Sequence, residues 1–252
     1  MKTLLRLSYL SALFALVLAT PLSPTRAAEP FTDAQLQQID KMIHSYIMKN
    51  PRVILDAVQQ MQAQEEESKK QQARQNLVAF RDQLVNDPKA PVAGNPKGDV
   101  TIVEFFDYRC GYCKRVAPTV EKALNEDGNL RIVYKEFPIL GPDSVVAARA
   151  SLSVWRMAPA KYMDFHNALM GARGSISQEL VVAEAEKLGL DGDALTREMQ
   201  SEEIENDIRN NHQLAQALGI SGTPAFIIGN ELVPGAVDLD TLQSLIKEAR
   251  GS

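Results

Sequence analysis

The two cysteines of this chain lie three positions apart, as Cys110 and Cys113 with Gly111 and Tyr112 between them. An apolar run typical of a buried strand, residues 100–106, ends just before this pair, and the segment after it has a helical pattern. This arrangement places Cys110 at a helix N-terminus, where unpaired backbone N–H groups and the positive end of the dipole favour a thiolate. The pair therefore predicts a strand–turn–helix unit with a reactive thiol at the turn.

A redox role explains this spacing better than a structural one. Closing so short a loop removes little entropy from the unfolded chain, so a structural disulfide here stabilises weakly. Structural zinc needs about four ligands, and His44, His166 and His212 are not spaced as a pair. A haem attachment motif needs His after the second cysteine, where this chain has Lys114. A metal-binding module, such as a copper chaperone, stays open as an alternative.

The order of the two cysteines predicts their roles. Cys110, at the start of the helix, is expected to be the nucleophile that forms a mixed disulfide with the substrate. Cys113, one turn on and more buried, resolves that intermediate by attacking Cys110. Gly111 and Tyr112 adjust the thiolate but carry no positive charge, so we expect a weaker oxidant than a protein with His at position 112. We predict no metal and no cofactor beyond the disulfide itself.

Residues 1–27 have the pattern of a cleaved secretory signal. Lys2 and Arg6 form a positive start, and the apolar stretch at 7–19 is too short to span a bilayer comfortably. The mature protein is expected where disulfides persist, in the periplasm, with the outer membrane or cell surface as an alternative place. The net charge is −5 and the cations are scattered along the sequence, so nucleic acid is not an expected partner.

Residues 28–86 are predicted to form a helical oligomerisation region. Thr32 and Gln35 match a capping box, and a second helix is expected from Pro51 to about residue 85. Two interpretations stay open. The helices form a stalk that joins two or three copies through residues 32–85, or they form a solvated arm on their own domain. The apolar residues at helical spacing are Leu36, Ile39, Ile43, Ile47, Ile54, Val58, Met61, Leu77, Phe80 and Leu84.

Residues 87–252 are predicted to form an α/β domain. A linker with three prolines and two glycines, residues 86–98, precedes it. The strand at 100–106, the helix that follows it and an alternating segment at 130–137 suggest a βαβ unit. The other expected elements are a helical insertion at about 141–218, a strand at 225–229, its hairpin partner at 231–233 and a terminal helix at 239–250.

The sequence Gly222-Thr223-Pro224 stands directly before the late strand. A proline there marks a turn or a strand start when taken alone. In one chain with the Phe-Phe-Asp-Tyr-Arg-Cys-Gly-Tyr-Cys run and the helical block, it makes residues 91–250 resemble the DsbA family. The helical extension resembles that of ScsC-like and surface-associated DsbA-like proteins, which oligomerise. The fold implied is α/β, a thioredoxin fold with an inserted helical domain, preceded by an N-terminal helical extension.

The resemblance also implies roles for residues outside the cysteine pair. Pro224 is expected to be cis and to pack against the pair, and Thr223 to give backbone contacts to substrate. Glu104, six residues before Cys110, is expected to be the buried carboxylate beneath the disulfide that relays a proton to or from Cys113. Lys135 is a candidate partner for Glu104 on the neighbouring strand.

One departure from the family bears on activity. DsbA has Pro-His between its cysteines, whereas Gly111 and Tyr112, together with Thr223 before the proline, resemble the isomerase DsbC. We therefore expect an exported disulfide isomerase or reductase, with a DsbA-like oxidase as the alternative and a metal-binding or chaperone-like module as the alternative from another class. The expected partners are unfolded or misoxidised exported proteins and a membrane redox partner.

Overall fold

The computed structural model describes residues 31–251, and their contacts divide the chain into two units after Met61. The predicted signal at residues 1–27 lies outside the described residues. Residues 62–86, which we predicted to belong to the oligomerisation region, share their contacts with the C-terminal unit. The functional division at residue 86 stays a prediction. Every helix within the described range is too short or too polar to span a bilayer.

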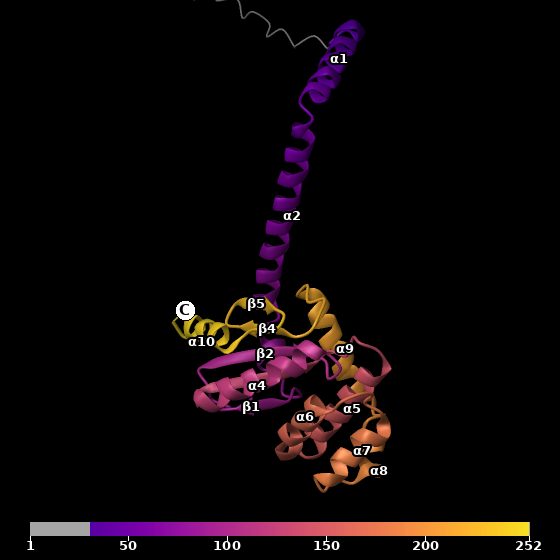
Figure 1. Cartoon of the computed structure of the whole chain (residues 1–252), viewed down its shortest axis with the longest axis vertical. Helices are drawn as coiled ribbons and strands as arrows, with labels where there is room; N and C mark the ends of the chain where they lie inside the picture. Colours follow the sequence, from indigo (N-terminus) through magenta and orange to yellow (C-terminus); the bar gives the residue numbers. More distant parts are fainter. Residues whose placement is uncertain (1–30, 252) are drawn as a thin grey trace, which may run out of the picture. The chain divides into compact units, whose positions relative to one another are not determined.

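The N-terminal unit begins with α1 (Asp33–Lys49), and α2 (Arg52–Ala79) follows it (Figure 1). The predicted capping box opens α1, since the Gln35 N–H donates to Thr32 Oγ1 at 3.4 Å and the Thr32 N–H donates to Gln35 Oε1 at 2.9 Å. No residue of α1 is buried. The exposed large apolar side chains of this unit are Phe31, Leu36, Ile39, Met42, Ile43, Tyr46, Met48, Val53, Ile54, Leu55, Val58 and Met61.

The helix predicted from Pro51 to residue 85 is broken in the structure. It begins at Arg52 and ends at Ala79, and a short helix, α3 (Arg81–Val85), follows. Phe80 leaves the helical conformation at φ −99° and ψ 10°. The break follows from tertiary packing, because Leu77, Phe80 and Leu84 all join the hydrophobic core of the C-terminal unit.

The C-terminal unit is built on a five-stranded sheet in the order β1-β3-β2-β4-β5. β2 and β3 run parallel, and the other neighbouring pairs are antiparallel. The helix α4 (Gly111–Glu126) connects the parallel pair, as the predicted βαβ unit requires. The strands are β1 (Val92–Gly94), β2 (Val100–Phe106), β3 (Leu130–Glu136), β4 (Ala225–Ile228) and β5 (Glu231–Pro234).

Helices cover both faces of the sheet. On one face, α4 and the terminal helix α10 (Leu239–Gly251) pack on alternate residues of β2 such as Ile102 and Phe106. On the other face, Val103 and Phe105 pack against apolar residues of α3 and α9. β2 is thus buried on both sides, which explains its nearly continuous apolar sequence.

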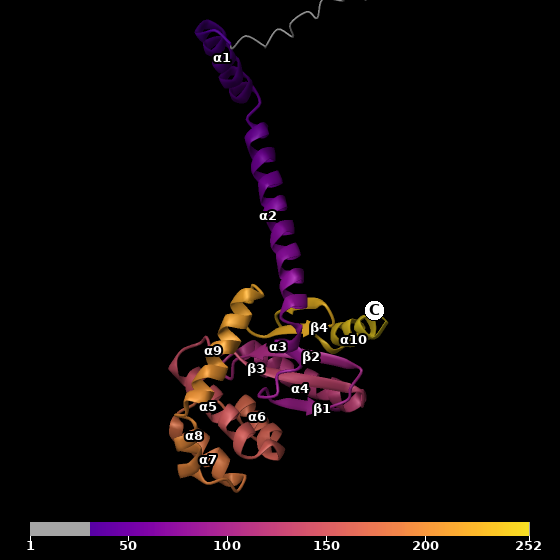
Figure 2. The ribbon, with the colours of Figure 1, turned by 180° about the vertical axis from the view of Figure 1, so that it is seen from behind.

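The helical insertion predicted at about 141–218 is confirmed as a run of helices between β3 and β4. In both views α5, α6, α7 and α8 group together on one side of the sheet (Figures 1 and 2). The α6 helix contacts α4, so the insertion lies against the helix that begins at the cysteine pair. Its elements are α5 (Pro142–Met157), a 3₁₀ turn (Pro159–Lys161), α6 (Tyr162–Gly171), α7 (Gln178–Lys187), α8 (Gly192–Glu198) and α9 (Glu202–Ala217).

Candidate active site

Cys110 is the N-cap residue of α4, as the sequence predicted. Its φ of −72° and ψ of 117° are extended, and α4 begins at the next residue. The amide N–H of Cys110 donates to the Asp107 carbonyl at 3.0 Å, and the Lys114 N–H donates to the Cys110 carbonyl at the same distance. The sulfur therefore lies where α4 presents its unpaired N–H groups.

Asp107 positions this turn, and the sequence analysis did not single it out. Its carboxylate is 2% exposed and accepts three backbone N–H bonds. One comes from Arg109 at 2.7 Å, and the others come from Ile139 at 2.8 Å and Leu140 at 3.1 Å. An Asp that directly follows a strand and bonds the amide two residues on is the local signal of an Asx turn.

The Thr223–Pro224 peptide bond is cis, as the resemblance implied. The Cys110 thiol donates to the Thr223 carbonyl at 3.2 Å. Two segments more than a hundred residues apart in the chain therefore meet at the reactive sulfur. Of the two residues between the cysteines, Tyr112 is 59% exposed, and a Cβ added at Gly111 meets nothing within 4 Å. Both residues face solvent beside Cys110.

Cys113 has a different environment from Cys110. Its side chain is fully buried, whereas Cys110 is 6% exposed. Burial raises the pKa of the Cys113 thiol well above its ordinary value, and the nearby Glu104 carboxyl raises it further. Cys113 is therefore held as a neutral thiol, which fits the expected division between an attacking and a resolving cysteine.

Glu104 lies on the face of β2 that packs against α4. Residues 102, 104 and 106 alternate onto this face, and the apolar neighbours Ile102 and Phe106 belong to the same core as Cys113. Its cross-strand partners are Tyr134 on β3 and Phe226 on β4. Glu104 is 2% exposed, and burial raises the pKa of its carboxyl to about 8.

The predicted pairing of Lys135 with Glu104 is wrong. The register of β2 and β3 places Lys135 opposite Phe105, and so on the other face of the sheet. Its ammonium group instead donates to Asp87 Oδ2 at 2.6 Å. Side chains alternate along a strand, so a shift of one residue in register moves a group to the opposite face.

A buried polar cluster joins the active-site turn to the insertion. The Tyr108 hydroxyl lies 2.6 Å from Ser151 Oγ and 3.0 Å from His166 Nδ1. Burial lowers the pKa of His166 to about 3, so its ring is neutral at physiological pH. The Tyr162 hydroxyl donates to Glu136 Oε1 at 3.3 Å, and burial raises the pKa of Glu136 to about 8. Only tertiary structure could reveal this cluster, because its members come from separate elements.

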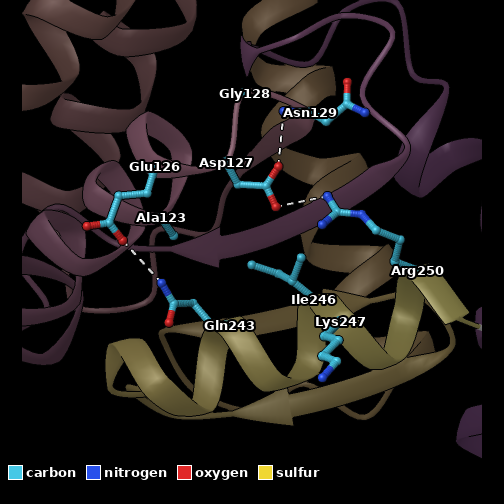
Figure 3. Close-up of a pocket in the computed structure, with 9 residues that line it drawn as sticks. All are labelled: Ala123, Glu126, Asp127, Gly128, Asn129, Gln243, Ile246, Lys247 and Arg250. Atoms are coloured by element: carbon cyan, nitrogen blue, oxygen red, sulfur yellow. Dashed lines mark hydrogen bonds and ion pairs between the residues drawn. The ribbon is translucent and has the colours of Figure 1, made fainter.

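Two surface hollows flank α4. One, of about 320 Å³, lies beside the nucleophile, and Tyr112, Thr223, Pro224, Ile220 and Leu232 are among its lining residues. The other lies at the C-terminal end of α4, where Asp127 binds Arg250 at 2.9 Å and Glu126 accepts a bond from Gln243 at 3.1 Å (Figure 3). The first hollow is lined by Tyr112, which lies between the cysteines, and by Thr223, whose carbonyl accepts from the Cys110 thiol, whereas the second is lined by residues at the far end of α4. We therefore place the chemistry at the first.

Comparison with known proteins assigns the family. A model of the DSBA-like thioredoxin domain matches residues 101–247, more than half of the chain. The protein belongs to this family. Residues 35–67 match a second model, the N-terminal domain of the copper resistance protein ScsC. The family consists of thiol–disulfide oxidoreductases, and the cysteine pair of this member occupies the helix N-terminus that such chemistry requires.

Three relatives cover different shares of this DsbA-like protein. A thioredoxin-like oxidoreductase from Silicibacter pomeroyi is 46% identical, with a TM-score of 0.65 over 68% of this chain and 98% of its own. A linker-deleted mutant of Proteus mirabilis ScsC is 27% identical, with a TM-score of 0.68 over 90% and 99%. Disulfide bond formation protein D of Bacillus subtilis is 28% identical over 64% of this chain and 78% of its own.

Proposed function

We propose that this oxidoreductase isomerises wrongly paired disulfides in exported proteins. The observation that supports the proposal is the contrast between the two thiols. Cys110 is 6% exposed and lies at a helix N-terminus, whereas Cys113 is fully buried with the pKa of its thiol raised by burial. A neutral resolving thiol attacks slowly, because only the thiolate is nucleophilic. The mixed disulfide therefore persists long enough for a second substrate thiol to attack it.

The reaction proceeds by exchange without net oxidation. The Cys110 thiolate attacks one sulfur of a substrate disulfide, that bond breaks, and the other substrate sulfur leaves as a thiolate. A different substrate thiolate then attacks the mixed disulfide and expels Cys110, which returns as a thiolate while a new pairing forms. No cofactor takes part, and Tyr112, Gly111, Thr223 and Pro224 form the surface that receives the substrate chain.

Cys113 and Glu104 release Cys110 from a mixed disulfide that no substrate thiol resolves. When substrate thiols fail to react, Cys113 loses its proton and attacks Cys110 to form the Cys110–Cys113 disulfide, and the substrate leaves reduced by two electrons. We assign the acceptance of that proton to the ionised fraction of Glu104, whose carboxyl has its pKa raised by burial to about 8 and is therefore partly ionised near neutral pH. A membrane-bound reductase must then return two electrons to the pair.

An oxidase is the second candidate, and the similarity to disulfide bond formation protein D favours it. In that case the Cys110–Cys113 disulfide accepts two electrons from a pair of substrate thiols, and a membrane oxidase regenerates it. The reduction potential separates the candidates, because a strong oxidant lies near about −120 mV and protein disulfide isomerase near about −180 mV.

The decisive experiment compares two activities of the purified full-length mature protein. An isomerase restores activity to a scrambled, disulfide-rich protein when the pair is reduced, and Cys110→Ser abolishes this. Brisk oxidation of reduced substrate without any reactivation would leave only the oxidase. The redox state of the pair in cells, trapped by alkylation, gives an independent answer, since isomerases rest reduced and oxidases rest oxidised.

We further propose that the N-terminal unit joins two or three copies of the chain. Leu36, Ile39, Ile43 and Tyr46 are exposed on α1 at alternating spacings of three and four residues, which is the spacing of a coiled-coil seam. Such an assembly would gather several active sites around shared substrate. The predicted signal at residues 1–27 supports a place in the periplasm or at the cell surface.

A further inference from the structure

The surroundings of Cys110 carry a concentration of positive charge that the exchange chemistry leaves unused. Arg109 precedes the nucleophile, and Lys114 and Arg115 follow one turn on. Arg173 belongs to the loop between α6 and α7. Arg109, Arg115 and Arg173 are exposed, and Lys114 is half-buried. We call these four residues the cationic rim.

Contacts hold the cationic rim at the active site. The Lys114 ammonium group donates to the Ala172 carbonyl, which brings the loop that contains Arg173 against the start of α4. The Arg115 guanidinium lies 4.2 Å from the centre of the Tyr112 ring, and Tyr112 lines the hollow beside the nucleophile. A guanidinium over an aromatic face is held by cation–π attraction and keeps its donors available.

Arg109 is fixed on another side of the nucleophile. One of its terminal nitrogens donates to the Leu140 carbonyl at 2.9 Å. That bond orders the side chain but does not neutralise it, because a carbonyl carries no charge. The nearby Asp143 carboxylate, whose pKa is lowered by its hydrogen bonds and by Arg109, offsets part of the Arg109 charge. The cations therefore come from three segments of the chain, which are the turn before Cys110, the first turns of α4 and the loop that Lys114 binds.

Acidic groups do not balance the cationic rim. The segments that border the nucleophile and its hollow are 107–115, 139–143, 172–175, 219–224 and 232–237, and within these described segments the one acid that reaches the surface is the half-buried Asp143. Asp143 is already bonded to the Ser175 hydroxyl at 2.6 Å and to the Ile176 N–H at 3.3 Å. Asp107 is buried, and its carboxylate accepts bonds from three backbone N–H groups. Four cations face one partly exposed anion here, although the whole chain has a net charge of −5.

We propose that the cationic rim selects polypeptide substrates whose cysteines are flanked by Asp or Glu. This inference rests on the proposed exchange function and names its preferred substrate class. Cations that stabilise the Cys110 thiolate accelerate exchange with every substrate alike. Cations that surround the place where the substrate chain must lie also attract acidic flanks and repel basic ones. The comparison of substrates therefore separates selection from activation.

The test uses the full-length mature protein in its disulfide form and three peptides that each contain two cysteines. The peptides differ only in flanking residues, which are Glu, Gln or Lys. Each peptide gives up two electrons and two protons to become an intramolecular disulfide, while the Cys110–Cys113 disulfide is reduced to two thiols. At low ionic strength we expect the acidic peptide to react about ten-fold faster than the basic one. At about 0.5 M salt, where screening is strong, the ratio should fall toward one.

Two charge-reversed variants provide the comparison. The double variant Arg115→Glu with Arg173→Glu should abolish or invert the preference. The matched control, Lys97→Glu with Lys247→Glu, makes the same change in net charge. Lys97 precedes β2 and Lys247 lines the hollow at the far end of α4, so this control should keep the preference of the unmodified protein.

The neutral peptide separates the possible failures. Equal rates for acidic and basic peptides in the unmodified protein, with brisk turnover of the neutral peptide, would refute selection by the cationic rim and leave the exchange function intact. Selection by the rim is also refuted if the rim variant and the control shift the preference equally, because net charge alone would then explain it. Failure of all three peptides to react would contradict the proposed function and this inference together.

Discussion

Burial shifts the pKa of individual residues around the cysteine pair. Glu104 and Glu136 lie on neighbouring strands, are almost fully buried, and have the pKa of their carboxyls raised by burial to about 8. Both are therefore mostly protonated at pH 7 in the folded protein and ionised in the unfolded chain. Only Glu104 contributes to the raised pKa of the Cys113 thiol, so one of two similar acids is coupled to the chemistry.

Replacement of Glu104 by Gln is expected to stabilise the reduced protein in a pH-dependent way. The folded-state pKa of Glu104 lies above the unfolded value, so the unfolded chain loses this proton first and stability falls between about pH 4.5 and 8. Glu104→Gln removes that loss, so the free energy of unfolding should rise by on the order of 4 kcal/mol at pH 7.5 and by little at pH 5. Denaturant titrations at the two pH values measure the difference.

The same variant should slow the resolving step. Without a proton acceptor near Cys113, release of the mixed disulfide should slow by about ten- to a hundred-fold. Glu136→Gln is the control, because it should reproduce the gain in stability without the loss of rate. A Glu104→Gln protein that resolves mixed disulfides at the normal rate would contradict the assignment of proton transfer to Glu104.

Asp107 supports the turn that presents the nucleophile. Replacement by Ala leaves three backbone N–H groups without their carboxylate acceptor, which should lower the free energy of unfolding by about 3 kcal/mol. Exchange by Cys110 should slow as well, since the turn no longer holds the start of α4. Asp107→Asn keeps one acceptor oxygen, so its free energy of unfolding should lie between those of Asp107→Ala and the unmodified protein. Equal stability for Asp107→Ala and the unmodified protein would show that water replaces these bonds.

At the scale of secondary structure, the residue at which an element begins and the side chains that it exposes decide its role in the protein. β2 is apolar throughout because helices cover both of its faces, and its end positions α4 so that Cys110 becomes the N-cap. α1 shows the opposite pattern, since none of its residues is buried although its apolar side chains follow helical spacing. An exposed stripe of this kind is typical of a helix that pairs with another helix.

Charges placed in the α1 stripe should dissociate the assembly. The double variant Ile39→Lys with Ile43→Lys introduces two cations into the proposed seam, where burial of a charge is unfavourable. The mass in solution, measured by light scattering, should fall to that of one chain. The matched variant Gln38→Lys with Ser45→Lys carries the same charge on the opposite face of α1 and should remain assembled. An unchanged mass for the first variant would refute the seam.

At the scale of the whole molecule, truncation at one point in the chain should separate the two units, whereas truncation at a later point should remove part of one unit. The division follows Met61, whereas Leu77 and Leu84 lie in the hydrophobic core of the C-terminal unit at 6% and 2% exposure. Asn76 also donates from its side chain to the Ala217 carbonyl at the end of α9. The last turns of α2 therefore belong to the fold that carries the active site.

Two truncations test this division. A mature chain that begins after Met61 should be monomeric, should oxidise peptide thiols normally and should lose isomerase activity, because its active sites no longer share a substrate. A chain that begins after residue 86 also loses Leu77 and Leu84, each worth about 2–5 kcal/mol in a core, and should unfold at much lower denaturant. Equal stability of the two products would show that these leucines contribute little.

Features encoded by short stretches of sequence were predictable. The positions of the cysteines, the capping box at Thr32, and the strands β2 and β3 follow from residue type and period, which act over a few residues. The family resemblance added the cis peptide before Pro224 and the burial of Glu104. The interruption at Phe80 was missed, because Phe80 matches the helical pattern and leaves it only to pack against the sheet.

The remaining features depend on which distant segments meet. Lys135 binds Asp87 and not Glu104 because strand register, a property of the assembled sheet, decides the face of each side chain. Tyr108 and His166 become partners only when α6 packs beside the active-site turn. Arg173 joins the cationic rim only because Lys114 binds its loop. The predictable features depend on residues that are close together in the chain, whereas the remaining features depend on how the chain folds. A hydrogen bond or ion pair forms wherever the core brings two groups within about 3 Å.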